Sequence, residues 1–151
     1  MPLRPARATA AALAFAAAAA VAGCAGPSRT DDDYRHKAAN TAETMQGLIG
    51  TVQLAVDAAS HHKVPAPYLS VTLAEADDDA TATVGTFDSV QPPSDQADQL
   101  RDKLDTLLQN TTSVLDDLRI AVRRGDISSL PKIAAPLKDL NDKLQPIVDL
   151  T

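Results

Sequence analysis

Aromatic residues are scarce in this chain, which has no tryptophan and only two tyrosines and two phenylalanines among its 151 residues. Proteins that recognise bases or sugars by stacking rely on several exposed aromatic rings. One of the four rings, Phe15, lies in an N-terminal apolar run, so Tyr34, Tyr68 and Phe87 are all that remain for the rest of the chain. Recognition by stacking is therefore not expected.

Cysteine is almost absent as well, since Cys24 is the only one in the sequence. A single thiol cannot form an intramolecular disulfide, so side-chain packing alone must hold the fold. No second cysteine is available as a nucleophile, no Gly-x-Ser-x-Gly motif or phosphate-binding glycine loop occurs, and the three histidines are dispersed. We therefore expect no catalytic residues, no cofactor and no enzymatic activity.

Basic residues are outnumbered by acidic ones, with 14 Lys+Arg against 20 Asp+Glu. Two of the basic residues, Arg4 and Arg7, precede Cys24, whereas every acidic residue follows it. The part from Cys24 onward therefore has a formal charge of −8 when its histidines are neutral. Nucleic-acid partners require clustered positive charge against the phosphates, so this balance predicts no nucleic-acid partner.

The N-terminal segment has the composition of an export signal. Arg4 and Arg7 give it a positive start, and residues 8–20 are uncharged and rich in alanine. This run is shorter than the roughly 20 residues that a transmembrane helix needs. A charged start, a short apolar centre and small residues at the end are typical of a secretory signal peptide.

The segment Val21-Ala22-Gly23-Cys24 resembles the lipobox of bacterial lipoprotein precursors: an aliphatic residue, two small residues and a cysteine. The resemblance covers the first two dozen residues. It implies a signal peptide at 1–23 that is cleaved before Cys24, a diacylglycerol on the Cys24 sulfur and acylation of the new amino group. Two or more acyl chains anchor a protein stably, whereas one does so only marginally.

Residues 24–30 would then be a short lipidated tether, and the partner at this end would be the membrane, through the lipid on Cys24. The expected location is the cell membrane, on its extracytoplasmic face. Two alternatives are ordinary secretion with a coincidental cysteine and an uncleaved apolar arm.

The rest of the chain, residues 31–151, shows the periodicity of amphipathic helices, with apolar residues recurring in steps of three and four. Four helices are predicted, at about 31–61, 68–90, 94–124 and 127–149. Thr30 is a candidate N-cap for the first, and Ser94 or Asp95 for the third. Prolines separate the first three helices, and Gly125 ends the third. Pro136 and Pro146 fall inside the fourth, where they predict kinks.

Four such helices joined by short connections favour an all-α fold, an up-down-up-down antiparallel four-helix bundle that follows a cleaved N-terminal signal peptide. The predicted core stripe of the first helix includes Tyr34, Met45, Ile49 and Val52, and the strongest stripe, on the third, includes Leu104, Leu108, Leu115 and Leu118. Gly47 and Gly50 interrupt the first helix, either to admit a neighbouring backbone or to mark a bend.

Three constellations of polar residues invite a metal or catalytic interpretation. Asp33 with His36 has the i, i+3 spacing of bundle metal ligands, Asp57 with His61 is spaced i, i+4, and residues 77–79 are three consecutive aspartates. Each lacks convergent ligands from other helices, and successive helical residues point about 100° apart. We therefore expect a solvated ion pair, a helix C-terminal cap at His61 and a solvated acidic face, with no metal site.

Charge is segregated along the predicted bundle. Six basic or titratable residues cluster near the ends of the first and third helices, away from the tether: His61, His62, Lys63, Arg119, Arg123 and Arg124. Cations are favoured at helix C-termini by the helix dipole, which explains such a cluster without any function. The alternative hypothesis is that this tip meets an anionic envelope polymer or an acidic protein surface.

The sequence therefore predicts a lipid-anchored, extracytoplasmic lipoprotein that serves as a non-enzymatic binding, adaptor or structural module of the bacterial cell envelope. Alternatives are a small-ligand or metal-binding helical bundle, an uncharacterised envelope enzyme, and a helix array that keeps one apolar stripe exposed until a partner covers it.

Replacing Cys24 by alanine should abolish acylation, because the substitution removes the sulfur that would carry the diacylglycerol. We expect the wild-type protein to partition with membranes and its mass to match a chain that begins at acylated Cys24. The Cys24→Ala chain should stay in the aqueous fraction or keep its leader. Mass spectrometry checks both, and a wild-type product with an unmodified thiol and an intact leader would contradict the assignment.

Overall fold

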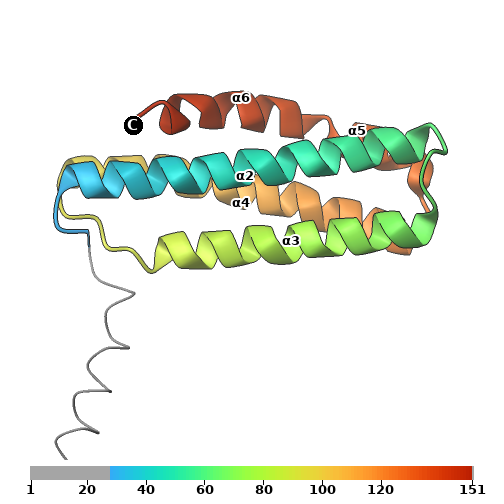
Figure 1. The fold of residues 1–151 in the computed structure, drawn as a ribbon, viewed down its shortest axis with the longest axis horizontal. Coiled ribbons are helices and arrows are strands. Elements are labelled where there is room, and N and C mark those ends of the chain that lie inside the picture. Colours follow the sequence, from blue (N-terminus) through green and yellow to red (C-terminus); the bar gives the residue numbers. More distant parts are fainter. Residues whose placement is uncertain (1–27, 151) are drawn as a thin grey trace, which may run out of the picture.

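The structure is a computed structural model that describes residues 28–150 (Figure 1). The lipobox residues Val21, Ala22, Gly23 and Cys24 lie outside the described residues, as do residues 25–27 of the tether. The described chain is all-helical, with elements α2 (Asp31–Ser60), α3 (Ala66–Asp88), α4 (Asp95–Arg123), the 3₁₀ turn η2 (Ile127–Ser129), α5 (Leu130–Ala134) and α6 (Pro136–Val148).

Four helical rods lie side by side, the fourth made of α5 and α6 (Figure 1). We call the end with residues 28–30 and the α3–α4 connection the tether end. The opposite end, with the α2–α3 loop and the α4–α5 connection, is the distal tip. Within the described chain, α2 contacts α3, α4 and α6, whereas α3 and α6 do not contact each other. The cross-section is therefore a rhombus, with α2 and α4 on its short diagonal.

Side-chain caps start two of the helices where the sequence predicts them. Thr30 Oγ1 accepts a hydrogen bond from Asp33 N at 3.1 Å, and Ser94 Oγ accepts one from Ala97 N at 3.2 Å. Each cap satisfies a backbone donor that the first helical turn leaves unpaired. Ser94 Oγ also donates to Asp31 Oδ1 at 2.6 Å, so the cap of α4 is joined to the first turn of α2.

The fourth helix differs from its prediction, because residues 127–149 form three pieces instead of one kinked helix. Pro136 is the first residue of α6 and so breaks the rod at Ala135, since proline lacks the backbone donor that a continuous helix needs. Pro131 lies in the first turn of α5, where proline is tolerated. Only Pro146 lies inside a helix.

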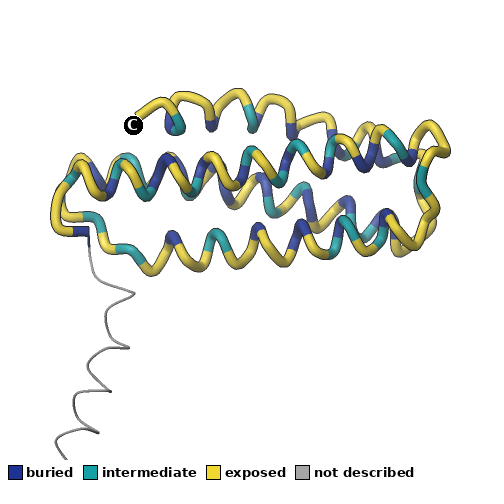
Figure 2. Tube along the Cα trace, in the orientation of Figure 1, coloured by how far each residue is buried: buried dark blue, intermediate teal, exposed yellow. Residues whose placement is uncertain are grey.

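The core is formed by the predicted stripes, which recur once per turn on the facing sides of the helices (Figure 2). Leu104, Leu108, Leu115 and Leu118 are at most 1% exposed, so the strongest predicted stripe is confirmed. Alanine supplies many of the remaining core positions and lets the rods approach closely. The buried helical residues that the stripes did not include are Ala39 and Ala55 on α2, Asp77 on α3, Ala97 and Thr111 on α4, and Ala134 on α5.

The glycines of α2 do not admit a neighbouring backbone. A methyl group added at Gly47 or Gly50 would meet no atom within 4 Å, so both positions face open space. The first of the two interpretations from the sequence is therefore wrong. Among residues 28–150, no helix is long and apolar enough to cross a membrane.

Truncation of a core leucine tests the packing. Leu104→Ala should lower the free energy of unfolding by about 2–5 kcal/mol, because it removes buried methyl groups and leaves a cavity. Leu54 on α2 is 74% exposed, so Leu54→Ala is the matched control and should change stability by less than about 0.5 kcal/mol. Chemical denaturation followed by circular dichroism measures both. Equal effects of the two substitutions would contradict the described packing.

Candidate functional site

The distal tip begins where α2 ends, in a backbone motif that closes the helix. His61 is the C-cap, His62 N donates to Ala59 O at 3.0 Å and Lys63 N donates to Ala58 O at 2.8 Å. This pair of bonds is a Schellman motif, and it requires a left-handed residue after the cap. That residue is His62, with φ at 55°.

The end of α4 repeats the same motif. Arg124 is the C-cap, Gly125 N donates to Val122 O at 2.9 Å and Asp126 N donates to Ala121 O at 3.0 Å. Here the left-handed position is filled by Gly125, with φ at 74°, as glycine is most often found there. His62 therefore holds a left-handed backbone conformation that has a lower steric energy in glycine. Of the two left-handed residues at the tip, His62 is the strained one.

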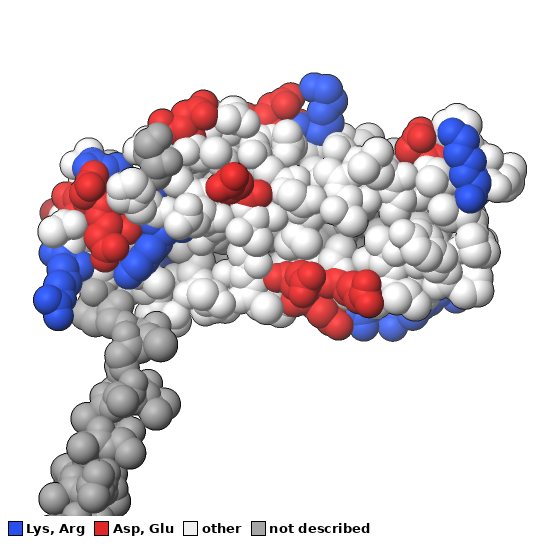
Figure 3. Space-filling view, viewed as in Figure 1, with Lys and Arg blue, Asp and Glu red and all other residues white. Residues whose placement is uncertain are grey.

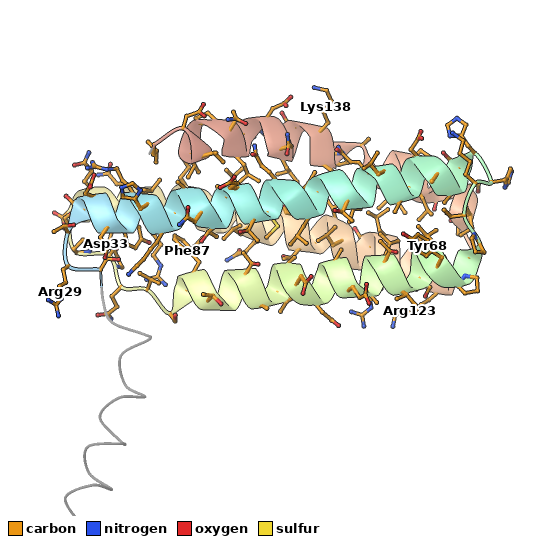
Figure 4. All side chains as sticks on the ribbon, viewed as in Figure 1. Arg29, Asp33, Tyr68, Phe87, Arg123 and Lys138 are labelled. Carbon is orange, nitrogen blue, oxygen red and sulfur yellow. The ribbon has the colours of Figure 1, made fainter. Side chains whose placement is uncertain are left out.

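Three cations of the tip are exposed and make no ion pair with any described residue. They are Lys63 in the α2–α3 loop, Arg123 in the last turn of α4 and the C-cap Arg124. Figure 3 shows Lys or Arg side chains at this end of the bundle, and Figure 4 shows Arg123 beside α3 near the same end. Unpaired exposed cations remain available to an anionic partner.

Arg119 does not belong to this group, which corrects the sequence-based assignment. Its guanidinium donates to Asp77 Oδ2 on α3, and this bond is the main cause of the raised pKa of Arg119. Arg119 lies one turn before Arg123 on α4, farther from the tip, where it reaches Asp77 of α3. Asp77 is only 8% exposed, so it is also no part of a solvated acidic face, because its carboxylate is used between α3 and α4.

The carboxylates of the tip are already engaged. His61 Nδ1 lies 2.8 Å from Asp57 O and 3.4 Å from Asp57 Oδ1, so the predicted capping role of His61 is confirmed. Hydrogen bonds from Ser129 and Ser128 lower the pKa of Asp126, and Ser128 Oγ lies 3.1 Å from Asp126 Oδ1. Both carboxylates thus serve local structure, and the cations of the tip are left without partners.

A cleft of about 430 Å³ lies between the two loops of the tip. It is lined by both apolar and polar residues: Ala59, Ser60, His62, Gly125, Ile127, Ser128 and Pro131. The strained His62 is therefore part of the wall of a concave surface, next to the unpaired cations.

The tip does not assemble a hydrolytic triad. Ser60 Oγ lies 3.4 Å from His61 Nδ1, but the same nitrogen faces Asp57, whereas a triad uses one ring nitrogen for each partner. Ser60 and Lys63 have the Ser-x-x-Lys spacing of some acyl-transfer enzymes, as do Ser129 and Lys132. Neither serine is hydrogen bonded to its lysine: Ser60 Oγ donates to Asp57 O, and Ser129 Oγ to Asp126 O.

The other constellations remain local. His36 Nε2 lies 3.7 Å from Asp32 Oδ2, whereas Asp33 pairs with Lys37 at 3.3 Å, so the predicted solvated pair forms one residue away from the expected partner. Among the described residues, no group of three His, Cys, Asp or Glu side chains is placed to hold a metal ion.

Two groups with perturbed pKa values lie near the tether end. Burial raises the pKa of Tyr34 to about 12, and its hydroxyl has no hydrogen-bond partner. Burial, with Asp88 nearby, also raises the pKa of Asp105, although Arg101 Nε lies 3.5 Å from it. The Tyr34 ring packs against Phe87 with centroids 5.8 Å apart, so we interpret this cluster as part of the packing.

Comparison with protein families, with characterised proteins and with solved structures finds no match to this chain. Function must therefore be argued from the residues and geometry of the chain itself.

His62→Gly tests whether the tip retains a strained residue at the expense of stability. We expect the free energy of unfolding to rise by up to about 1 kcal/mol, because glycine adopts a positive φ without steric cost. Gly125→Ala is the reciprocal control and should lower it, since alanine is strained at that φ. Thermal unfolding measures both, and a loss of stability in His62→Gly would show that the imidazole itself supports the loop.

Proposed function

We propose that this chain is a lipid-anchored, extracytoplasmic lipoprotein of the bacterial cell envelope, with no enzymatic activity of its own. Its four helices form an up-down-up-down antiparallel bundle after a cleaved signal peptide. The bundle acts as a binding or adaptor module that presents its distal tip to an anionic envelope polymer or an acidic protein surface. The single observation that carries the binding role is the set of unpaired cations at the tip: Lys63, Arg123 and Arg124.

The anchoring half of the proposal is supported by the lipobox resemblance and by the position of the tether. Only Ala25, Gly26 and Pro27 separate Cys24 from Ser28. Four residue steps span at most about 14 Å, so lipid on Cys24 would keep the tether end close to the bilayer. From Asp31 to Ser60, α2 covers about 44 Å at 1.5 Å per residue. The tip would then be held well away from the lipid surface.

The binding half is supported by the contrast between the tip and the rest of the surface. From Cys24 onward the chain is strongly acidic, yet the exposed cations at the tip lack ion pairs. The dipoles of α2 and α4 favour cations there, and the side chains of Arg123 and Arg124 make no ion pair with a described residue. An acidic protein with a basic tip would approach an anionic partner in one orientation.

Reversal of charge at the tip is the test. The double variant Arg123→Glu with Arg124→Glu should weaken binding to a polyanion by more than about tenfold, because it turns attraction into repulsion. Polyphosphate and poly-L-glutamate serve as probes of the two anion chemistries. Binding of the wild-type chain should also weaken as salt rises. Surface plasmon resonance with the acylated protein captured in a lipid layer gives the affinities.

The matched control reverses two exposed cations on α6, Lys138→Glu with Lys143→Glu, whose ion pairs are with Asp142 and Asp139. This variant has the same net charge as the tip variant and should bind within about twofold of the wild type. If both variants lose binding equally, the effect comes from net charge and the tip has no special role. If neither does, the binding half of the proposal is wrong.

A further inference from the structure

The face formed by α2 and α3 carries a groove that the tip hypothesis does not use. Its volume is about 460 Å³ and it lies along the seam between the two helices, toward the tether end. The walls come from Asn40, Thr41, Thr44 and Leu48 on α2 and from Asp79, Ala82, Thr83 and Thr86 on α3. This seam is open because, within residues 28–150, no further helix packs on the outer side of α2 and α3.

Threonine makes the seam less polar than its sequence suggests. Thr44 Oγ1 donates to Asn40 O at 2.8 Å, Thr83 Oγ1 to Asp79 O at 2.8 Å and Thr86 Oγ1 to Ala82 O at 2.8 Å. Because each hydroxyl proton is used within its own helix, the groove offers a partner mainly methyl groups. Leu48 and Ala82 add further apolar surface to the same groove.

The apolar surface continues along the seam toward the distal tip. Tyr68 and Val71 on α3 are 57% and 55% exposed, which is unusual for large apolar side chains in a chain with few of them. Thr51 on α2 repeats the threonine pattern, donating to Gly47 O at 3.0 Å. The seam runs from Thr41 of α2 to the part of α2 that lies opposite Tyr68 of α3. It is about 25 Å long, which is the length of a helix of about 17 residues.

Beyond the first turns of α2, the charged residues of α2 and α3 are of one sign. Residues 38–60 of α2 and the whole of α3 contain no lysine or arginine. Glu43, Glu75 and Asp79 are exposed on these two helices and make no ion pair with any described residue. Figure 3 shows an acidic patch along the α3 edge and an uncharged surface over the distal half of this face. A partner must therefore combine apolar and basic side chains.

We propose that the α2–α3 seam is a docking groove for a basic amphipathic helix of a partner protein. The apolar stripe of that helix packs on the threonine methyls, Leu48 and Ala82, and its lysines or arginines face Glu75 and Asp79. Helix-in-groove recognition of this kind uses anchors at i, i+3, i+4 and i+7. A partner helix packed on the α2–α3 face would cover Tyr68 and Val71, which the bundle itself leaves exposed.

The groove is independent of the lipid anchor and of the basic tip. Its residues belong to α2 and α3 between the two ends, and its charge is opposite to that of Arg123 and Arg124. A partner for the groove is basic, whereas a partner for the tip is acidic or polyanionic. The two surfaces can therefore be tested separately, and failure of one leaves the other standing.

The test uses the full chain with Cys24→Ala, which removes the acylation site and keeps the whole bundle. The probe is a synthetic peptide of about 17 residues with leucine at helix positions i, i+3, i+4 and i+7 and lysine elsewhere. Its glutamate counterpart has the same apolar pattern. Fluorescence anisotropy should show binding of the lysine peptide only. Asp79→Lys should weaken it by about tenfold or more.

Two matched controls locate the contact. Asp117 is exposed on α4, away from the groove, and Asp117→Lys changes the net charge by the same amount as Asp79→Lys. It should alter the affinity for the lysine peptide by less than about twofold. Ala82→Trp fills the groove and should abolish binding, whereas Thr81→Trp on the other side of α3 should not. Circular dichroism verifies that each variant folds. Equal binding of both peptides, or equal loss in Asp79→Lys and Asp117→Lys, would overturn the proposal.

Discussion

The fold depends on apolar packing around α2, which contacts α3, α4 and α6. No disulfide can reinforce it, and large aromatic rings are nearly absent, so the stability comes from leucine, isoleucine and alanine at close separation. Two polar contacts pin the ends of this arrangement: Ser94 with Asp31 joins α4 to α2 at the tether end, and Arg119 with Asp77 joins α4 to α3 nearer the tip. Gln46 also joins α2 to α6, and Arg101 joins α4 to the end of α3.

The two ends of the bundle differ in chemistry because of how their helices begin and end. Helix starts at the tether end collect aspartates, which suit the positive end of the helix dipole, and the Thr30 and Ser94 hydroxyls accept backbone donors there. Helix ends at the distal tip collect cations and two Schellman motifs, one of which places His62 in the conformation that suits glycine. An acidic protein thereby acquires a basic, partly concave tip, and this polarity is the physical basis of the proposed function.

The long faces of the bundle are not equivalent either. On the α2–α3 face, threonines bond back to their own helices and no basic residue occurs in residues 38–60 of α2 or in α3, so an apolar seam runs beside unpaired carboxylates. On α6, by contrast, Lys138 and Lys143 pair with aspartates one turn away, and this surface is internally neutralised. A module with a basic tip and an acidic apolar groove could join two unlike partners, which is the property expected of an adaptor.

The sequence by itself determined the four helical rods, most residues of the core stripes, the cap at Thr30, Ser94 or Asp95 as the cap of α4, and the end of α4 at Gly125. These follow from periodicity and backbone chemistry along one helix. Its lipobox also predicts the anchor, at residues outside the described structure. Only the tertiary structure decided that Pro136 breaks the fourth rod, that Asp77 is buried and that Arg119 leaves the tip to pair with it. The same holds for the α2–α3 seam. Such features arise between helices, and the periodicity of a single helix says which face is buried but not which neighbour lies against each edge of it.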